Sequence, residues 1–360
     1  MDSETARNIG TSIIVPSVQE LAKQPITEVP ERYVRPNQDP IIVSNTTSLP
    51  QVPVIDLSKL LSHDSSHELE KLDHACKEWG FFQLINHGVN PALVENFKKE
   101  VQQFFNLPIE KKKEFWQKPG EMEGFGQMFV VSDEHKLEWA DLFHIVTLPS
   151  YIRKPHLFPR IPQPFRDVLD KYSLEMKKLG DTIIELMSKA LNIEPNELLE
   201  FTEEGVEAMR MNYYPPCPQP EKVIGLNPHS DVSTLTILLQ VNETVGLQVR
   251  NNGMWIPIKP LPNSFVVNIG DFLEVLTNGI YRSIEHRAIV NSEKERISIA
   301  TFLNPRHECV IGPVPSLVTP ERPATFNKIS VRDFLEGYLS QELKGKSQLD
   351  VLRIHNGIDK

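Results

Sequence analysis

The spacing of apolar residues divides the chain into a helical first half and a β-rich second half. In the first half, apolar residues recur every three or four positions over Glu68–Trp79, Leu93–Phe105 and Phe165–Leu191, which predicts three amphipathic helices. Short apolar runs at Pro53–Leu57 and Phe81–Ile85 predict two strands among these helices. The third helix is long enough to support a larger structure, and the β-rich segment that follows it is expected to be that structure.

Short strand-like runs follow one another in the second half, separated by the turn-forming sequences PPCPQP, NNG and NSEKE. Seven strands are predicted there: Met209–Tyr214, Thr234–Gln240, Gly246–Arg250, Trp255–Lys259, Phe265–Ile269, Tyr281–Val290 and Arg296–Phe302. Many short antiparallel strands favour a jelly-roll barrel over a parallel α/β sheet. The predicted fold class is therefore mainly β, with flanking helices.

Four consecutive parts are expected along the chain. Residues 1–50 form a proline-punctuated extension with a short helix at Val15–Lys23. Residues 51–205 form an α/β region that contains the long supporting helix, and residues 206–306 form the jelly-roll core. Residues 307–360 form a carboxy-terminal helical segment, whose predicted helix (Val331–Leu343) packs on the outside or the edge of the core.

Composition narrows the functions that this chain can have. It has 360 residues, of which 40% are hydrophobic, so a sizeable core is available. The formal charge of −10, with no long run of Lys or Arg, argues against nucleic acid or an anionic membrane as the main partner. No apolar run is long enough to span a bilayer, so a small-molecule partner is expected.

Three cysteines, Cys76, Cys217 and Cys309, form no CxxC pair, and their odd number argues against a disulfide framework. We therefore expect free thiols in a reducing compartment. The polar amino terminus, MDSETARNIG, does not read as a signal or transit peptide. A cytoplasmic protein, either a monomer or a weak homodimer, is expected.

A candidate metal site lies in the β-rich half. His229 and Asp231 are two residues apart, so in an extended strand both side chains point the same way, and His286 can join them from another strand. Two imidazoles and one carboxylate leave three coordination positions open, which suits iron(II) that must bind a co-substrate together with O2. An HxD tripeptide also arises by chance in many chains, so the spacing alone leaves a site without metal open.

Arg296 and Ser298 form a second candidate pair, two residues apart on the last predicted strand of the core. The planar guanidinium of Arg holds a carboxylate through two hydrogen bonds, and Ser adds a hydroxyl donor. An Arg directed into the barrel is costly to bury without an anion, which a dicarboxylic co-substrate would supply. An edge-strand Arg that points to solvent is the alternative interpretation.

Taken together, these motifs resemble the plant 2-oxoglutarate-dependent dioxygenases, in register from about residue 53 to residue 305. The matching motifs are PVID (53–56), WGFF (79–82), NHG (86–88), GFG (124–126), NYYPPCPQP (212–220), HSD (229–231), NIGD (268–271), YRSIEHR (281–287) and RIS (296–298). Within that family, the chain resembles the subgroup of SRG-type proteins and thebaine and codeine O-demethylases. That likeness rests on VPSVQELA (15–22), KPHLF (154–158) and MRMNYYPPCP (209–218).

The resemblance implies a distorted double-stranded β-helix (jelly-roll, cupin-like) core and assigns roles to individual residues. The residues that match the iron(II) ligands are His229, Asp231 and His286. The residues that match contacts to 2-oxoglutarate are Arg296, Ser298, Asn212 and Tyr214. O2 is the oxidant, and ascorbate is expected as a reductant.

Three further residues fall at positions where the family places its substrate pocket. His144 follows the segment Trp139–Phe143 and either faces the substrate or is a partly exposed loop histidine. Arg210 is a second pocket position. Phe302 either stacks on an aromatic or polycyclic ligand or belongs to the core.

The resemblance implies an oxidoreductase that couples decarboxylation of 2-oxoglutarate to hydroxylation, O-demethylation or desaturation of a small plant specialised metabolite, such as an alkaloid or flavonoid. A hormone-like substrate oxidised by the same chemistry is the alternative. Two other classes stay open: a non-catalytic jelly-roll binder, and a zinc hydrolase with a His-His-Asp site. Neither needs both an open iron site and the clamp made by Arg296 and Ser298.

Overall fold

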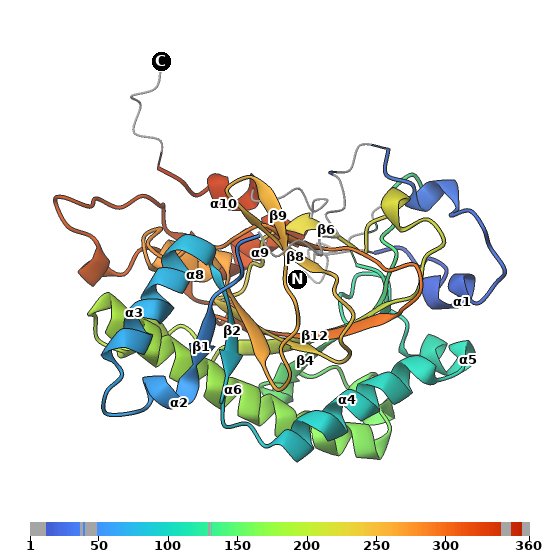
Figure 1. The fold of residues 1–360 in the computed structure, drawn as a ribbon, viewed down its shortest axis with the longest axis horizontal. Coiled ribbons are helices and arrows are strands. Elements are labelled where there is room, and N and C mark those ends of the chain that lie inside the picture. The colour runs from blue at the N-terminus through green and yellow to red at the C-terminus, as the bar shows by residue number, and fades with distance from the viewer. Residues whose placement is uncertain are drawn as a thin grey trace, which may run out of the picture.

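The computed structural model describes residues 12–36, 39, 49–128, 130, 132–339 and 347–354. Its main element is an eight-stranded sheet with the order β1-β2-β10-β7-β12-β5-β4-β3 (Figure 1). The strands, in that order, are Val54–Asp56, Phe81–Ile85, Phe265–Ile269, Leu235–Gln240, Arg296–Asn304, Val206–Tyr214, Asp141–Leu148 and Gly124–Gly126. Only β1 and β2 are parallel, and the other pairs are antiparallel.

A four-stranded sheet with the order β6-β11-β8-β9 forms the opposite wall. Its strands are Leu226–His229, His286–Ala288, Leu247–Asn251 and Met254–Pro257. Side chains from both sheets line one interior cavity, so the two sheets face each other as the walls of a barrel. The predicted mainly-β fold, a jelly-roll core with flanking helices, is confirmed.

Helices cover the outer face of the large sheet, as α4 (Pro91–Asn106) and α6 (Gln163–Leu191) show in Figure 1. The predicted long helix is α6, which begins two residues early and ends at the predicted residue. Its buried residues share one core with those of the sheet. At Gly180 the contact is close, because an added Cβ would lie 1.9 Å from Leu303 Cδ1.

The remaining helices are short. They are α1 (Val18–Ala22), α2 (Leu57–Leu60), α3 (Ser66–His74), α5 (Ile109–Lys112), α7 (Asn196–Leu199), α8 (Asp271–Leu276), α9 (Val331–Leu339) and α10 (Ser347–Asp350). A two-stranded sheet, β13 (Val310–Ile311) with β14 (Ile329–Ser330), precedes α9. No helix in the described ranges has the length and apolar content needed to cross a membrane. All three cysteines are free thiols.

One predicted strand is shorter than expected. The strand predicted over Tyr281–Val290 is wrong for most of its length, since β11 covers only three residues. The reason is that the Ser283 N–H donates to the Glu274 carboxylate at 2.7 Å, which holds the preceding segment as a loop. The helix predicted over Glu68–Trp79, with a stop at Gly80, is confirmed. It begins at Ser66 as α3, continues as a π-helix over Ala75–Trp79, and is capped by Gly80, whose φ of 59° glycine easily adopts.

At both ends of the chain, the predicted helices differ from the structure in length. The helix expected at Val15–Lys23 is α1, limited to Val18–Ala22 because the Ser17 hydroxyl caps it by accepting from the Glu20 N–H. The Val331–Leu343 prediction corresponds to α9 as far as residue 339, and residues 340–343 lie outside the described residues.

Five strands were not predicted: β3, β4, β6, β13 and β14. Of these, β4 matters most, because it pairs with β5 along most of its length and brings His144 opposite Arg210. Its first residue, the buried Asp141, also accepts hydrogen bonds from the backbone N–H groups of Val18 and Gln19. The amino-terminal segment 12–36 is therefore tied to the barrel at the start of β4.

Candidate iron and 2-oxoglutarate site

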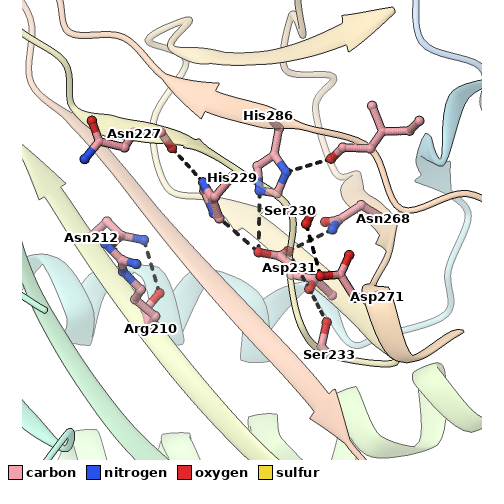
Figure 2. Close-up of polar contacts among 12 residues, drawn as sticks. Arg210, Asn212, Asn227, His229, Ser230, Asp231, Ser233, Asn268, Asp271 and His286 are labelled. Carbon is pink, nitrogen blue, oxygen red and sulfur yellow. Dashed lines mark hydrogen bonds and ion pairs between the residues drawn. The ribbon is translucent and has the colours of Figure 1, made fainter. Parts of the chain in front are cut away.

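Three buried side chains meet inside the barrel. His229 ends β6 and His286 begins β11, and the two residues are register partners across the small sheet. Asp231 lies in the turn that follows β6, and its Oδ1 is 3.4 Å from His229 Nε2 and 3.5 Å from His286 Nε2 (Figure 2). The strand ends at His229, and the turn that follows aims Asp231 at the two imidazoles.

Backbone carbonyls fix how the two imidazoles are protonated. His229 Nδ1 is 2.7 Å from the carbonyl oxygen of Asn227, and His286 Nδ1 is 3.1 Å from that of Ile284. A carbonyl can only accept, so each Nδ1 carries a proton, and Nε2 is the ring nitrogen that faces Asp231. This is the tautomer that a metal-binding imidazole requires.

Asp231 is held as an anion. Its Oδ2 accepts hydrogen bonds from Thr236 Oγ1 at 2.7 Å and from Asn268 Nδ2 at 2.8 Å, which leaves Oδ1 facing the imidazoles. Burial by itself would raise the pKa of Asp231, but His286, His229 and the Asn268 amide lower it well below its ordinary value. Burial and the nearby His229 lower the pKa of His286 to about 4, so that ring is neutral at pH 7.

These donors fit a divalent transition metal. One ligand atom from each of the three residues lies within 4.8 Å of the others, and all three residues are buried. In the described part of the chain, no other group of three His, Cys, Asp or Glu side chains meets this criterion. Two imidazoles and one carboxylate occupy one face of a metal and leave the other positions open, as in the non-haem iron(II) oxygenases.

On one side of these donors, a narrow cavity of about 50 Å³ leads to Arg296. Arg296 lies on β12 with only 2% of its surface exposed, so the solvent-pointing alternative is excluded. Its terminal nitrogens donate to Ser298 Oγ and Gln240 Oε1, each at 3.3 Å, and its guanidinium lies 5.1 Å from the Tyr214 ring centre. Gly246 makes room for it, because an added Cβ would be 2.6 Å from Arg296 Cδ.

The charge of Arg296 has no anionic counterpart among the described residues. No carboxylate there forms an ion pair with it, and its buried Nε has no hydrogen-bond partner. A buried, uncompensated cation is costly, so this end of the cavity favours an anionic ligand. Asn212, the fourth predicted contact, lies beside the same cavity and accepts a hydrogen bond from Arg210 Nε at 2.8 Å.

On the other side of the donors lies a wider pocket of about 400 Å³. The three predicted substrate residues all line it. His144 is on β4 rather than in a loop, directly across from Arg210 on β5, and Phe302 lies on β12. His144 Nδ1 has no hydrogen-bond partner, and burial together with Arg210 lowers the pKa of this imidazole to about 4.

Sequence reasoning missed much of this pocket. Its additional lining residues include Met122 and Glu123 ahead of β3, and Leu335, Glu336 and Tyr338 on α9. The helical pattern of residues 331–339 indicated an element there, but nothing in it indicated which side faces the barrel. The two cavities share four residues, namely Arg210, His229, Asp231 and Phe302.

Comparison with known protein families decides what this arrangement is. The model of the 2OG-Fe(II) oxygenase superfamily matches residues 205–305, and the model of the amino-terminal region of non-haem dioxygenases in morphine synthesis matches residues 52–161. The chain belongs to the 2-oxoglutarate- and iron(II)-dependent oxygenases. The predicted resemblance is confirmed, and the protein is an oxidoreductase that uses iron(II) and 2-oxoglutarate.

Individual relatives of this oxygenase cover almost its whole length. It is 53% identical to the oxoglutarate-dependent flavonoid 7-O-demethylase 1 of Ocimum basilicum, over 99% of this chain and 95% of the relative. It is also 53% identical to protein SRG1 of Arabidopsis thaliana, over 96% and 98% of the two chains. Its identity to codeine O-demethylase of Papaver somniferum is 50%, over 98% of this chain and 100% of the relative.

A solved structure confirms the fold of this oxygenase. JOX2, crystallised in complex with 2OG, Fe and JA, is 34% identical and superposes with a TM-score of 0.85, over 94% of this chain and 98% of the other. The core is therefore the double-stranded β-helix of this superfamily, with the His229, Asp231 and His286 donors inside it.

Proposed function

We propose that this oxygenase removes a methyl group from a methoxylated plant specialised metabolite, a flavonoid or an alkaloid. The main support is that the donors of His229, Asp231 and His286 lie where the narrow cavity and the wider pocket meet. A co-substrate in one cavity and a substrate in the other would therefore reach the same metal. The flavonoid and codeine O-demethylases at 53% and 50% identity support the reaction type and the two substrate classes.

The iron is proposed to be held by His229 Nε2, His286 Nε2 and the Asp231 carboxylate. Bound there, iron(II) would supply the activation of O2 that no protein side chain can provide. Hydrogen bonds to the Asn227 and Ile284 carbonyls and from the Asn268 amide keep these side chains oriented. One carboxylate would cancel only half of the 2+ charge of iron(II), and the remaining positive charge would attract an anionic 2-oxo acid.

In this proposal, 2-oxoglutarate lies in the narrow cavity with its distal carboxylate on Arg296 and Ser298. The bidentate geometry of the guanidinium and the hydroxyl beside it suit a planar carboxylate. Tyr214 packs against the guanidinium and limits its rotation, while Asn212 contributes polar surface further along the cavity. Burial of the pair excludes water that would otherwise compete for the guanidinium.

The substrate is proposed to lie in the wider pocket, with its methoxy group toward Asp231 and His229. A volume of about 400 Å³ is within the usual range for a site that encloses one small molecule. Phe302 and Tyr338 offer aromatic surface, and Met122 and Leu335 offer apolar surface that adapts to a polycyclic ring. His144 and Arg210 supply the polar groups that orient it.

The test is a screen of methoxylated flavonoids and alkaloids with the purified protein, iron(II), 2-oxoglutarate, O2 and ascorbate. Each turnover should consume one O2 and one 2-oxoglutarate and yield the hydroxyl product, formaldehyde, succinate and CO2. Mass spectrometry would detect the loss of a methylene from the substrate. Gain of oxygen or loss of two hydrogens instead would assign hydroxylation or desaturation and overturn demethylation.

Metal replacement separates this proposal from the two other classes. Iron(II) should restore activity to the metal-free protein, whereas zinc should not. Hydrolysis supported by zinc alone would favour a hydrolase. Tight binding of a metabolite without any consumption of 2-oxoglutarate would favour a binder.

The cellular setting is also a proposal. The charge of −10 and the three free thiols support a cytoplasmic protein. A monomer or weak homodimer is proposed, and light scattering coupled to gel filtration tests it, since a stable tetramer would contradict it. A fluorescent fusion imaged in plant cells tests the compartment.

A further inference from the structure

Glu138 stands just behind the candidate iron site. It lies between the buried residues Leu137 and Trp139, a few residues before β4, and 14% of its side chain is exposed. Its backbone is anchored on both sides, since the Leu137 N–H donates to the Arg32 carbonyl and the Trp139 N–H to the Ile224 carbonyl. The carboxylate is therefore presented to the barrel from a fixed position.

The two oxygens of this carboxylate contact two different parts of the site. Oε1 accepts a hydrogen bond from the Asn227 backbone N–H at 2.8 Å. Oε2 lies 3.7 Å from a terminal nitrogen of Arg210, whose side chain is 9% exposed. Because both contacts are shielded from bulk water, each is worth more than an equivalent surface contact.

The contact with Asn227 leads directly to a candidate iron ligand. The same residue whose N–H is held by Glu138 uses its carbonyl to accept the Nδ1–H of His229 at 2.7 Å (Figure 2). A shift of the Asn227 backbone would therefore re-aim the His229 ring. Glu138 thus acts on His229 through one intervening residue.

The contact with Arg210 leads to the other side of the site. Arg210 lines both cavities, and its Nε donates to the Asn212 amide oxygen at 2.8 Å. Glu138 supplies a negative charge beside this guanidinium. One carboxylate thereby orients a metal-facing ring and the cation beside the co-substrate cavity.

We propose that Glu138 is a positioning residue of this oxygenase, which aligns His229 for iron(II) and Arg210 for 2-oxoglutarate. This inference rests on the proposed role of His229 as an iron ligand. Glu138 belongs to none of the motifs that predicted the site, and only its hydrogen bond with Asn227 and its ion pair with Arg210 reveal its position.

The test compares Glu138→Ala, Glu138→Gln and the matched control Glu134→Ala, which removes an exposed carboxylate from the same segment. Iron(II) alone is titrated into each metal-free protein without O2. Glu138→Ala should bind iron about tenfold more weakly, as expected when a contact that orients a metal ligand is lost. The control should match the wild type, and circular dichroism should confirm that each variant is folded.

Glu138→Gln separates the two contacts, because its amide oxygen still accepts from the Asn227 N–H but carries no charge. Iron affinity should stay near the wild-type value, while the KM for 2-oxoglutarate should rise several-fold with little change in kcat. An equal loss of iron affinity in Glu138→Gln and Glu138→Ala would contradict the role of the hydrogen bond. Should Glu138→Ala fail to fold, unchanged iron affinity and unchanged KM in Glu138→Gln would overturn the proposal.

A reference variant, His229→Ala, keeps this test independent of the proposed function. Wild-type iron affinity in His229→Ala would show that the ligand assignment itself is wrong. Loss of iron affinity in His229→Ala, together with wild-type affinity in a folded Glu138→Ala, would overturn only the role of Glu138.

Discussion

The two cavities that meet at the candidate iron site are built in different ways. The narrow one, which ends at Arg296, is lined almost entirely by strand residues of both sheets. The wider one takes side chains from the barrel rim, from the loop at 120–123 and from α9, which is packed outside the barrel. The first is about 50 Å³ in volume and the second about 400 Å³.

This difference separates the part of the site that the sheets hold in place from the part that side-chain packing shapes. Backbone ladders set the positions in the narrow cavity, where Arg296 pairs with Tyr214 and Ser298 with Asn212 across β12 and β5. Such pairs cannot move without breaking the sheet. The wider pocket depends on side-chain packing between separate elements, so substitutions there change its shape while the barrel stays intact.

The largest effect should come from the residue at the junction of the two cavities. Asp231→Gly should lower oxygenation by several orders of magnitude even at saturating iron, because the only anionic ligand is lost. The fold should survive, since Asp231 lies in a turn rather than in a strand. Product formation at high iron and circular dichroism measure this, with the exposed Asp64→Gly as control. A folded variant with near wild-type rate would disprove this ligand set.

Arg296→Leu should act on the narrow cavity alone. The apparent affinity for 2-oxoglutarate should fall by about 2–4 kcal/mol, roughly one to three decades, because a buried charge-assisted pair is lost. The requirement for the primary substrate should change little. Steady-state kinetics with each substrate varied in turn measures both, and Arg306→Leu, an exposed arginine just after β12, is the control. Equal changes in the KM for 2-oxoglutarate and the KM for the primary substrate would contradict separate roles for the two cavities.

His144→Phe should act on the wider pocket alone. The expected result is a several-fold shift in preference among methoxylated substrates, because an imidazole whose Nδ1 has no partner is replaced by an apolar ring. Decarboxylation of 2-oxoglutarate without substrate should be unchanged. Competition assays with paired substrates measure the shift, and iron titration provides the check, since loss of iron binding would place His144 in the metal site.

Glu207 lies on the opposite face of β5 from Arg210 and should affect stability only. Burial raises its pKa from 4.5 to about 7, despite a hydrogen bond from Thr147 Oγ1 at 2.6 Å. A raised pKa in the folded state means that folding favours the protonated carboxyl group. Its contribution to the free energy of unfolding is therefore present below pH 4.5 and is lost as the pH rises through about 7. Over that pH range the free energy of unfolding of the wild type should fall by up to about 3 kcal/mol more than that of Glu207→Gln.

Urea unfolding of the two proteins at pH 5 and pH 8 measures that difference, with the exposed Glu203→Gln as control. Activity at pH 7 should be unaffected, because Glu207 lines neither cavity. Parallel pH dependence in the wild type and Glu207→Gln would show that this carboxyl group does not couple to unfolding.

The periodic pattern of the chain was enough to predict the helices and most strands of the core. Long amphipathic repeats such as α6 and regular strands such as β7 and β10 carry their own signal, because one face of each is buried. The motifs placed His229, Asp231, His286 and Arg296 together by resemblance. In the structure these side chains converge on one interior site.

Tertiary structure alone decided what those residues touch. The sequence left open whether His144 lies in a loop or in a strand. The structure places it in β4, which pairs with β5, because strand formation there depends on a partner remote in sequence. The length of β11 depended on Glu274, which captures a backbone N–H that a longer strand would have used. The position of Glu138 behind Asn227 had no sequence signal, since a hydrogen bond across 89 residues leaves no local pattern. Local periodicity records which face is buried, whereas contacts between distant segments exist only once the barrel has closed.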